Sequence, residues 1–160
     1  MTRVMIVGAG PAGIRAAAEL AGAGLRPVVV DEGARAGGQI YRRPPQEFSR
    51  PARVLYGSEA GKAVALHKLF DALVAEGRVD YLPNRTVVGL SDGIAHLVGP
   101  EAGESSAFDR LILATGAMDR VAPVPGWQAA GVYTLGAAQI ALKAQGVGLG
   151  RRIVLAPGRF

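Results

Sequence analysis

Cysteine is absent from the 160-residue sequence, and histidine occurs only twice, at His67 and His96. Without cysteine, the chain has no disulfide, thiolate metal site, iron–sulfur cluster or redox dithiol of its own. The two histidines lie far apart in the sequence, which argues against a histidine-rich metal site. We expect His67 to lie on an amphipathic helix and His96 in a strand. No catalytic acid, base or nucleophile stands out among the remaining side chains.

The sequence also lacks the basic pattern of a nucleic-acid-binding protein, although its net charge is +5. No helical face combines basic residues with interleaved aromatics. Four of the arginines instead gather in one proline-rich segment, at Arg42, Arg43, Arg50 and Arg53. Some of this charge could serve the phosphates of a bound cofactor. We therefore expect a solvated loop or docking surface and no nucleic-acid partner.

Long apolar runs are scarce as well. One uncharged stretch, 121–142, is long enough to span a bilayer. It contains Pro123, Pro125, Gly126, Gly131 and Gly136, so we expect a turn-rich buried connection that leads into a short helix. The first strand begins within about three residues of the start, which leaves no room for a signal peptide. We expect a soluble, cytoplasmic protein without a membrane span.

What the sequence does contain is a glycine-rich turn, Gly8-Ala9-Gly10-Pro11-Ala12-Gly13, directly after the apolar run Val4–Val7. Gly8 allows a tight turn, Gly10 lets backbone approach a pyrophosphate, and Gly13 lets the following helix pack closely on the strand. The positive end of that helix would face the phosphates. Asp31 follows a second apolar run, 18 residues after Gly13, where a carboxylate can bind a ribose. Strand, turn, helix, strand and acid together predict a dinucleotide site.

The periodicity of the whole chain predicts an α/β fold with a Rossmann-like parallel sheet and an added antiparallel β-hairpin. Residues 32–58 lack periodicity and should form a long loop, and 100–106 a polar connection. The Asp92-Gly93 pair is typical of a hairpin turn. We expect strands at 3–7, 26–31, 79–82, 110–114 and 153–156, hairpin strands at 86–90 and 94–98, and helices at 11–23, 59–76 and 135–144.

Four segments in order give a family resemblance: Val7–Gly13, Val30-Asp31-Glu32, Gly37–Arg42 and Leu111–Ala117. Together they resemble the flavoproteins with two dinucleotide-binding domains. The finer resemblance is to the FAD-binding subunit of heteromeric amine and imino-acid dehydrogenases, a group that includes opine oxidase, hydrogen cyanide synthase and D-hydroxyproline dehydrogenase. The resemblance implies FAD as the cofactor, an amine or imino acid as the small-molecule substrate, and a partner oxidoreductase subunit.

The resemblance also implies roles for individual residues. The backbone at Gly10, Pro11 and Ala12, shaped by Gly8 and Gly13, would bind the FAD pyrophosphate. Asp31 would bind the adenosine ribose, with Glu32 as the alternative. The remaining contacts would come from the ribityl or phosphate side at Gly38, Gln39 and Arg42, from backbone at Val87 toward the adenine, and from Ala114, Thr115 and Gly116, which would close over the cofactor.

The end of the sequence departs from the family pattern. We expect residues 1–150 to form the FAD-binding domain and 151–160 to begin a second, truncated nucleotide-binding-like domain, which would leave the fold incomplete at its C-terminus. Pro157 and Arg159 stand where that domain's glycines would be expected. Two interpretations follow. The chain is part of an oxidoreductase that passes a hydride from substrate to flavin, or it is a non-catalytic remnant that binds a dinucleotide and docks to a partner. A nicotinamide dehydrogenase is disfavoured by Gly37-Gly38-Gln39 and the hairpin.

Overall fold

The computed structural model describes residues 2–45, 47–48, 50–101 and 103–156. It divides the chain into two units. The first comprises Met1–Arg43 and Arg50–Ala117, and the second comprises Pro44–Ser49 and Met118–Phe160. All of the residues with predicted cofactor contacts belong to the first unit.

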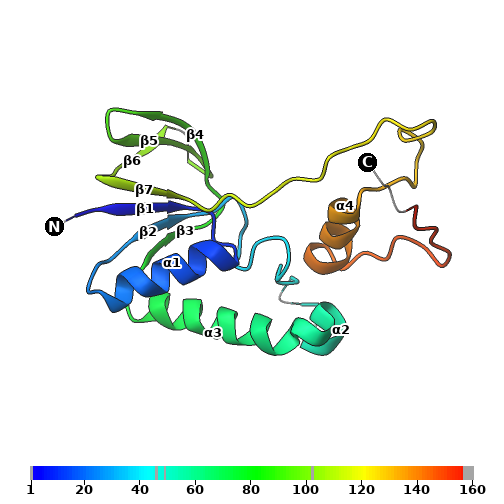
Figure 1. The fold of residues 1–160 in the computed structure, drawn as a ribbon, viewed down its shortest axis with the longest axis horizontal. Coiled ribbons are helices and arrows are strands. Elements are labelled where there is room, and N and C mark those ends of the chain that lie inside the picture. The colour runs from blue at the N-terminus through cyan, green and yellow to red at the C-terminus, as the bar shows by residue number, and fades with distance from the viewer. Residues whose placement is uncertain (1, 46, 49, 102, 157–160) are drawn as a thin grey trace. The chain divides into compact units, whose positions relative to one another are not determined.

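Four short parallel strands form the central sheet of the first unit (Figure 1). They are β1 (Val4–Val7), β2 (Val28–Val30), β3 (Asp80–Leu82) and β7 (Arg110–Leu113), in the order β3-β2-β1-β7. The register pairs Val7 with Val30 on one side and with Leu113 on the other. The four strands were predicted, and their parallel pairing places all of their carboxyl ends at one edge of the sheet.

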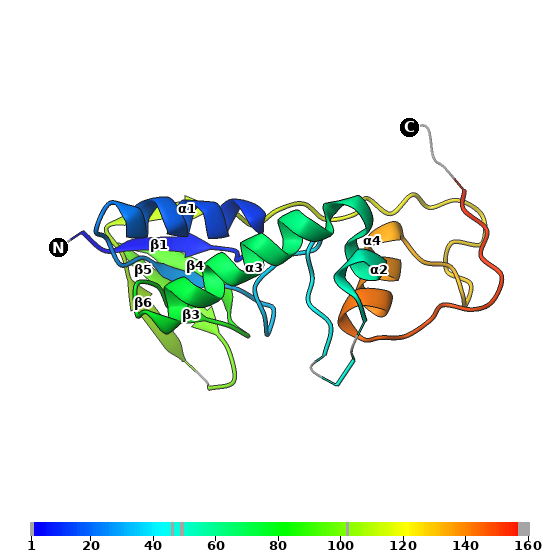
Figure 2. The ribbon, with the colours of Figure 1, turned by 90° about the horizontal axis from the view of Figure 1, so that it is seen from below.

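Two long helices cover one face of this sheet and lie side by side (Figures 1 and 2). They are α1 (Pro11–Gly22) and α3 (Ala60–Ala75), both predicted. A short helix, α2 (Ala52–Tyr56), and a 3₁₀ turn, η1 (Gly57–Glu59), precede α3. The expectation of an irregular segment over 32–58 is therefore wrong for its last third.

An antiparallel sheet covers the other face (Figure 1). Its strands are β4 (Thr86–Ser91), β5 (Ile94–Val98) and β6 (Glu104–Ala107), in that order. The predicted hairpin is confirmed, with positive φ at both Asp92 and Gly93, as a tight hairpin turn requires. The polar segment 104–107 forms a third strand, where a connection was expected.

The core of the first unit has two parts because the parallel sheet is covered on both faces. On the helix side, Ile6 and Val29 pack with Ile14, Phe70 and other buried residues of α1 and α3. On the opposite side, Met5 and Val30 pack with residues of the antiparallel sheet. Val4, Met5 and Ile6 are all buried, which confirms the expectation that β1 is covered on both faces.

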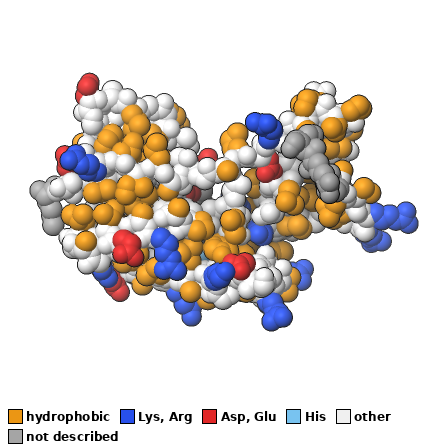
Figure 3. Space-filling model, in the orientation of Figure 1, with side chains coloured by type: hydrophobic (Ala, Val, Ile, Leu, Met, Phe, Trp, Pro, Cys, Tyr) orange, Lys and Arg blue, Asp and Glu red, His pale blue; other side chains and the backbone are white. Residues whose placement is uncertain are grey.

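The second unit contains the predicted helix over 135–144, as α4 (Leu135–Gln139) continued by a π-helical segment, Ile140–Ala144. The Thr134 hydroxyl caps α4 by accepting a hydrogen bond from the Ala137 N–H at 3.2 Å. The residues before the helix form turns, as expected, but they are exposed and not buried. Many apolar side chains therefore lie at the surface (Figure 3), among them Val121, Val124, Val132 and Leu135.

The predicted strand at 153–156 is wrong: these residues have no regular structure, and Val154 is 93% exposed. An apolar run forms a strand only where a neighbouring strand takes its backbone hydrogen bonds. Residues 157–160, with Pro157 and Arg159, lie outside the described part of the chain. Across the described residues, no helix combines the length and the apolar character needed to cross a membrane.

Candidate functional site

The turn between β1 and α1 is too tight for side chains at two of its glycines. Gly8 has φ +104°, its N–H donates to the Val30 carbonyl at 2.7 Å, and a Cβ there would lie 2.3 Å from the Ala114 carbonyl oxygen. A Cβ on Gly13 would lie 1.8 Å from the Gly8 carbonyl oxygen. The predicted close approach of the helix to the strand is therefore observed, and it joins the carboxyl ends of β1 and β7.

The first turn of α1 is open to a ligand. Gly10 is the N-cap and contributes no side-chain hydrogen bond, and Pro11 occupies the first helical position. The early N–H groups of the helix, at Ala12 and Gly13, thus have no capping side chain, which is the arrangement that binds anions.

Gly10 and Gly38 face each other beside this helix end and form a cradle without side chains. A Cβ on Gly38 would lie 2.8 Å from the Gly10 Cα. A Cβ on Gly10, by contrast, would meet only the Gly38 Cα, at 3.7 Å. The protein itself therefore leaves room for a methyl group at Gly10, and a phosphate group approaching the backbone fits that space.

Asp31 fixes the backbone around this cradle. One carboxylate oxygen accepts a hydrogen bond from the Ala9 N–H, and the other accepts one from the Gly33 N–H at 2.7 Å. Ala9 is fully buried, so its N–H depends on this acceptor. The adjacent Glu32 is exposed. The structure thus gives Asp31 a structural task in the loop and leaves the Glu32 carboxylate at the surface of the same edge.

The segment after β7 meets the Gly37–Gln39 turn at the same edge of the sheet. The Ala114 N–H donates to the Val7 carbonyl at 2.8 Å, and the Gln39 side-chain amide donates to the Ala117 carbonyl at 2.8 Å. Thr115 is exposed, and Gly116 has φ +74°. Two segments that the sequence predicted to approach one cofactor from different sides are therefore linked by Gln39. In parallel sheets, ligands bind outside the carboxyl ends of the strands, where this link lies.

Two further predicted residues differ in how closely they join this edge. Arg42 has a buried Nε that finds no partner among the described residues, so a hydrogen-bond donor is left for an external acceptor. Val87 lies on β4, where its side chain packs against the core between the two sheets. It follows Arg85, whose N–H donates to the Asp31 carbonyl at 2.9 Å. Any contribution of Val87 to a ligand would therefore come from its backbone, as predicted.

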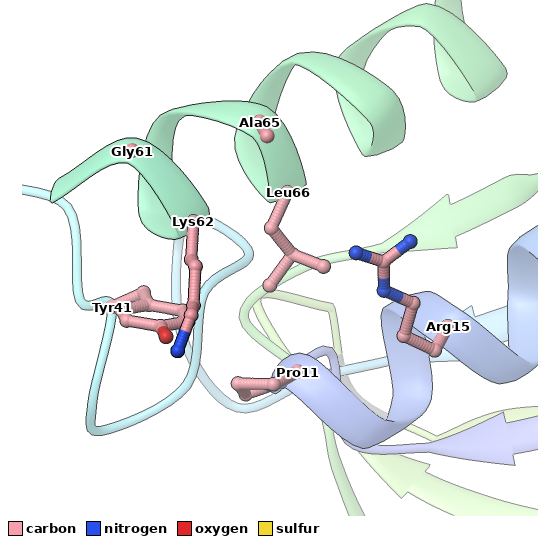
Figure 4. Close-up of a pocket in the computed structure, with 7 residues that line it drawn as sticks. All are labelled: Pro11, Arg15, Tyr41, Gly61, Lys62, Ala65 and Leu66. Atoms are coloured by element: carbon pink, nitrogen blue, oxygen red, sulfur yellow. The ribbon is translucent and has the colours of Figure 1, made fainter. Parts of the chain in front are cut away.

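A separate pocket of about 410 Å³ opens between α1 and α3 (Figure 4). Arg15 and Lys62 give it a basic rim, and Lys62 pairs with Glu59 at 3.0 Å. The pocket borders the glycine turn only at Pro11, and Tyr41 forms its wall on the loop side. Its lining residues are Pro11, Arg15, Tyr41, Gly61, Lys62, Ala65 and Leu66.

His67 lies on α3, as predicted, but it has a specific partner that the sequence did not suggest. Its Nε2–H donates to the Tyr41 carbonyl at 2.8 Å. Burial lowers the pKa of His67 below its usual 6.5, and the Arg43 and Arg35 charges act in the same direction, against the Tyr41 carbonyl and Asp71. An i, i+4 pair of His67 and Asp71 on a predicted helix is the one sequence signal that could have indicated this contact.

The lowered pKa of His67 predicts that acid destabilises the first unit. Because the unfolded chain binds a proton at His67 more readily than the folded chain, stability is full above about pH 6.5 and falls as the pH drops toward the folded-state pKa. Thermal unfolding between about pH 5 and pH 7.5 should show this slope. The variant His67→Gln should flatten it, and an unchanged slope in that variant would contradict the assignment.

Comparisons with known proteins agree with this geometry. A family model described as pyridine nucleotide-disulphide oxidoreductase matches residues 2–155. An opine oxidase subunit from Rhizobium meliloti is 44% identical over 163 residues, covering 96% of this chain and 30% of the relative. The hydrogen cyanide synthase subunit HcnB from Pseudomonas aeruginosa is 39% identical over 144 residues, covering 88% of this chain and 30% of the relative.

Among solved structures, the L-proline dehydrogenase from P. horikoshii shares the fold with a TM-score of 0.65 at 22% identity. The match covers 89% of this chain and 29% of that one. The chain thus spans about 30% of the length of the relatives it matches, and the resemblance read from its motifs is confirmed. Because the family model matches nearly every residue, the chain belongs to the pyridine nucleotide-disulphide oxidoreductase family.

Proposed function

We propose that the chain is the FAD-binding part of an oxidoreductase that acts on an amine or imino acid. The observation that carries this proposal is the cradle of Gly10 and Gly38 beside the uncapped first turn of α1. It lies at the carboxyl ends of the parallel strands, and only backbone lines it. A pyrophosphate needs this combination of N–H donors and free space.

The site residues would share the cofactor in the following way. The N–H groups of Ala12 and Gly13 would donate to the pyrophosphate, and the unpartnered Nε of Arg42 would reach a phosphate or ribityl oxygen. Glu32 would accept hydrogen bonds from the adenosine ribose, while Asp31 holds the turn in place. Backbone at Val87 would face the adenine. Gln39, Thr115 and Gly116 would border the flavin end, where Gln39 already holds the Ala117 carbonyl.

Bound FAD would supply the redox chemistry, and the chain's own residues would bind and orient it. The substrate class follows from relatives whose names are opine oxidase and L-proline dehydrogenase. Two relatives are named as subunits, which supports a partner subunit for this chain. A domain boundary near residue 150, with a second nucleotide-binding-like domain beginning at 151, remains part of the same proposal.

The proposal is tested by the visible spectrum of the purified chain after incubation with FAD and desalting. Flavin bands near the molar concentration of the protein would support it and justify assays with amine substrates. A folded, colourless protein would overturn it for this chain and favour the alternative, a non-catalytic remnant that docks to a partner.

The variant Gly10→Ala separates cofactor binding from folding. Its Cβ would make ordinary contact with Gly38 but would occupy the space that a pyrophosphate needs. We expect the affinity for FAD to fall by about 100-fold, or nearly 3 kcal/mol, with little change in the unfolding temperature. Titration of FAD fluorescence together with thermal unfolding measures both. Undiminished affinity in Gly10→Ala would place the pyrophosphate elsewhere.

A further inference from the structure

We propose that His67 and Asp71 on α3 are positioning residues that clamp the loop Gly37–Arg43 and thereby present Arg42 and Gly38 to the cofactor. This inference rests on the proposed function. It comes from side-chain contacts that join residues 41–43 to α3 and to the segment before it. We call these contacts the loop clamp, and its members are Tyr56, Glu59, His67 and Asp71.

The His67 contact holds the loop at its turn. The Nε2–H of His67 donates to the Tyr41 carbonyl at 2.8 Å, and the Tyr41 N–H in turn donates to the Gly37 carbonyl at 3.2 Å. A Cβ on Gly37 would lie 2.2 Å from the Tyr41 carbonyl oxygen and 3.1 Å from the His67 Nε2. The turn is therefore closed around the imidazole, and this closed form places Gly38 against Gly10.

The Asp71 contact holds the other end of the loop. The Arg43 guanidinium donates to both carboxylate oxygens of Asp71 at 2.9 Å each, and to the His67 carbonyl at 3.4 Å. The Arg43 side chain is only 10% exposed, whereas Asp71 is 59% exposed. A two-pronged pair of this kind fixes the orientation of the arginine as well as its distance.

Two tyrosines complete the loop clamp. The Tyr41 hydroxyl donates to a Glu59 carboxylate oxygen at 2.9 Å, and the Tyr56 hydroxyl donates to the Arg42 carbonyl at 3.0 Å. The Tyr56 ring lies edge-on to both Tyr41 and His67, with centroids 6.1 and 5.9 Å away. Edge-to-face pairs of this kind are favourable in themselves.

The consequence falls on Arg42. Its neighbours on both sides and its own carbonyl are held by α3 and the residues before it, yet its buried Nε has no partner among the described residues. A donor held on a fixed backbone and left unsatisfied costs free energy unless a ligand accepts from it. The loop clamp thus prepares Arg42 for an anionic group before that group arrives, which reduces the ordering that binding requires.

The test compares His67→Leu with His67→Gln, which keeps an N–H near the Nε2 position. The control is His96→Leu, because His96 lies on β5 and contacts Ser91, away from the loop. In the whole chain without FAD, amide exchange of peptides covering 37–43 should rise about tenfold in His67→Leu. The FAD dissociation constant should rise about tenfold as well. His67→Gln should stay within about threefold of the parent chain in both measurements.

Asp71→Asn serves as a second variant, because Asp71 is largely exposed and its replacement spares the core. It should raise exchange over 37–43 and weaken FAD binding about threefold. Unchanged exchange in both His67→Leu and Asp71→Asn would overturn the loop clamp, whatever FAD does. Faster exchange with undiminished FAD affinity would overturn its link to the cofactor. A parent chain that binds no FAD refutes the proposed function, and exchange alone then decides whether His67 and Asp71 hold the loop.

Discussion

Replacing Gly13 by alanine should lower the free energy of unfolding by at least about 3 kcal/mol, a large share of what a domain of this size possesses. The new Cβ would lie 1.8 Å from the Gly8 carbonyl oxygen, and Gly8 is itself held against Ala114. Backbone cannot move away on either side without separating α1 from β1 and β7. Urea unfolding followed by circular dichroism measures the loss.

The matched control lies on the same helix. Gly22, the last residue of α1, has no heavy atom within 4 Å of the position a Cβ would occupy. Gly22→Ala should therefore be neutral or stabilise the chain by about 0.5 kcal/mol, because alanine loses less backbone entropy in a helix. If Gly13→Ala unfolded at the same urea concentration as Gly22→Ala, the close helix–strand contact would be wrong.

Replacing Asp31 by alanine should have the second largest effect, on both stability and FAD binding. The N–H groups of Ala9 and Gly33 would lose their carboxylate acceptor, at a cost of about 3 kcal/mol for two charge-assisted hydrogen bonds. With the turn loosened, FAD affinity should fall more than about 100-fold. Asp31→Asn, which keeps one acceptor oxygen, should lie between the parent chain and the alanine variant in both measurements.

Glu32→Ala is the comparison that separates the two acids. Glu32 is exposed, so its removal should change the stability by no more than about 0.5 kcal/mol. If Glu32 is the ribose ligand, FAD affinity should still fall about tenfold, since one hydrogen bond to a charged group is lost. Unchanged affinity in Glu32→Ala would return the ribose contact to Asp31.

The parts of the fold that could be predicted are those where one local pattern has one physical solution. The run Val4–Val7 followed by a turn beginning at Gly8 can be satisfied only by a buried strand that enters a helix. Asp92-Gly93 between two apolar segments likewise allows only a tight hairpin, because both residues adopt positive φ. In these places the backbone conformation is decided by residues within a few positions.

The misses occur where the deciding partner lies far away in the sequence. Residues 104–107 are polar because β6 is an edge strand, so their pairing with β5 leaves no apolar signal. The run 153–156 carries a strong apolar signal, yet it has no regular structure in the described chain. Hydrophobicity selects segments that avoid water, whereas strand formation depends on which backbone lies beside them.

The candidate site shows the same division. The glycines and Asp31 could be placed from spacing alone, since strand, turn and helix geometry fixes their order. The second task of Asp31 and the contact of His67 with Tyr41 could not, because a carboxylate or imidazole gives no sequence sign of its acceptor or donor 22 or 26 residues away. Such contacts depend on how the loop Gly37–Arg43 crosses between α1 and α3.

The pairing of β1 with β7 also sets an order of events during synthesis. The strand at Val4–Val7 emerges from the ribosome first, but its neighbour at Arg110–Leu113 follows about a hundred residues later. Until then the nascent chain can form β1, α1, β2 and β3 while one side of β1 waits for its hydrogen bonds. Closing so large a loop is slow compared with local pairing. Conditions that delay translation between β3 and β7 should therefore lengthen the time in which this strand is open to other chains.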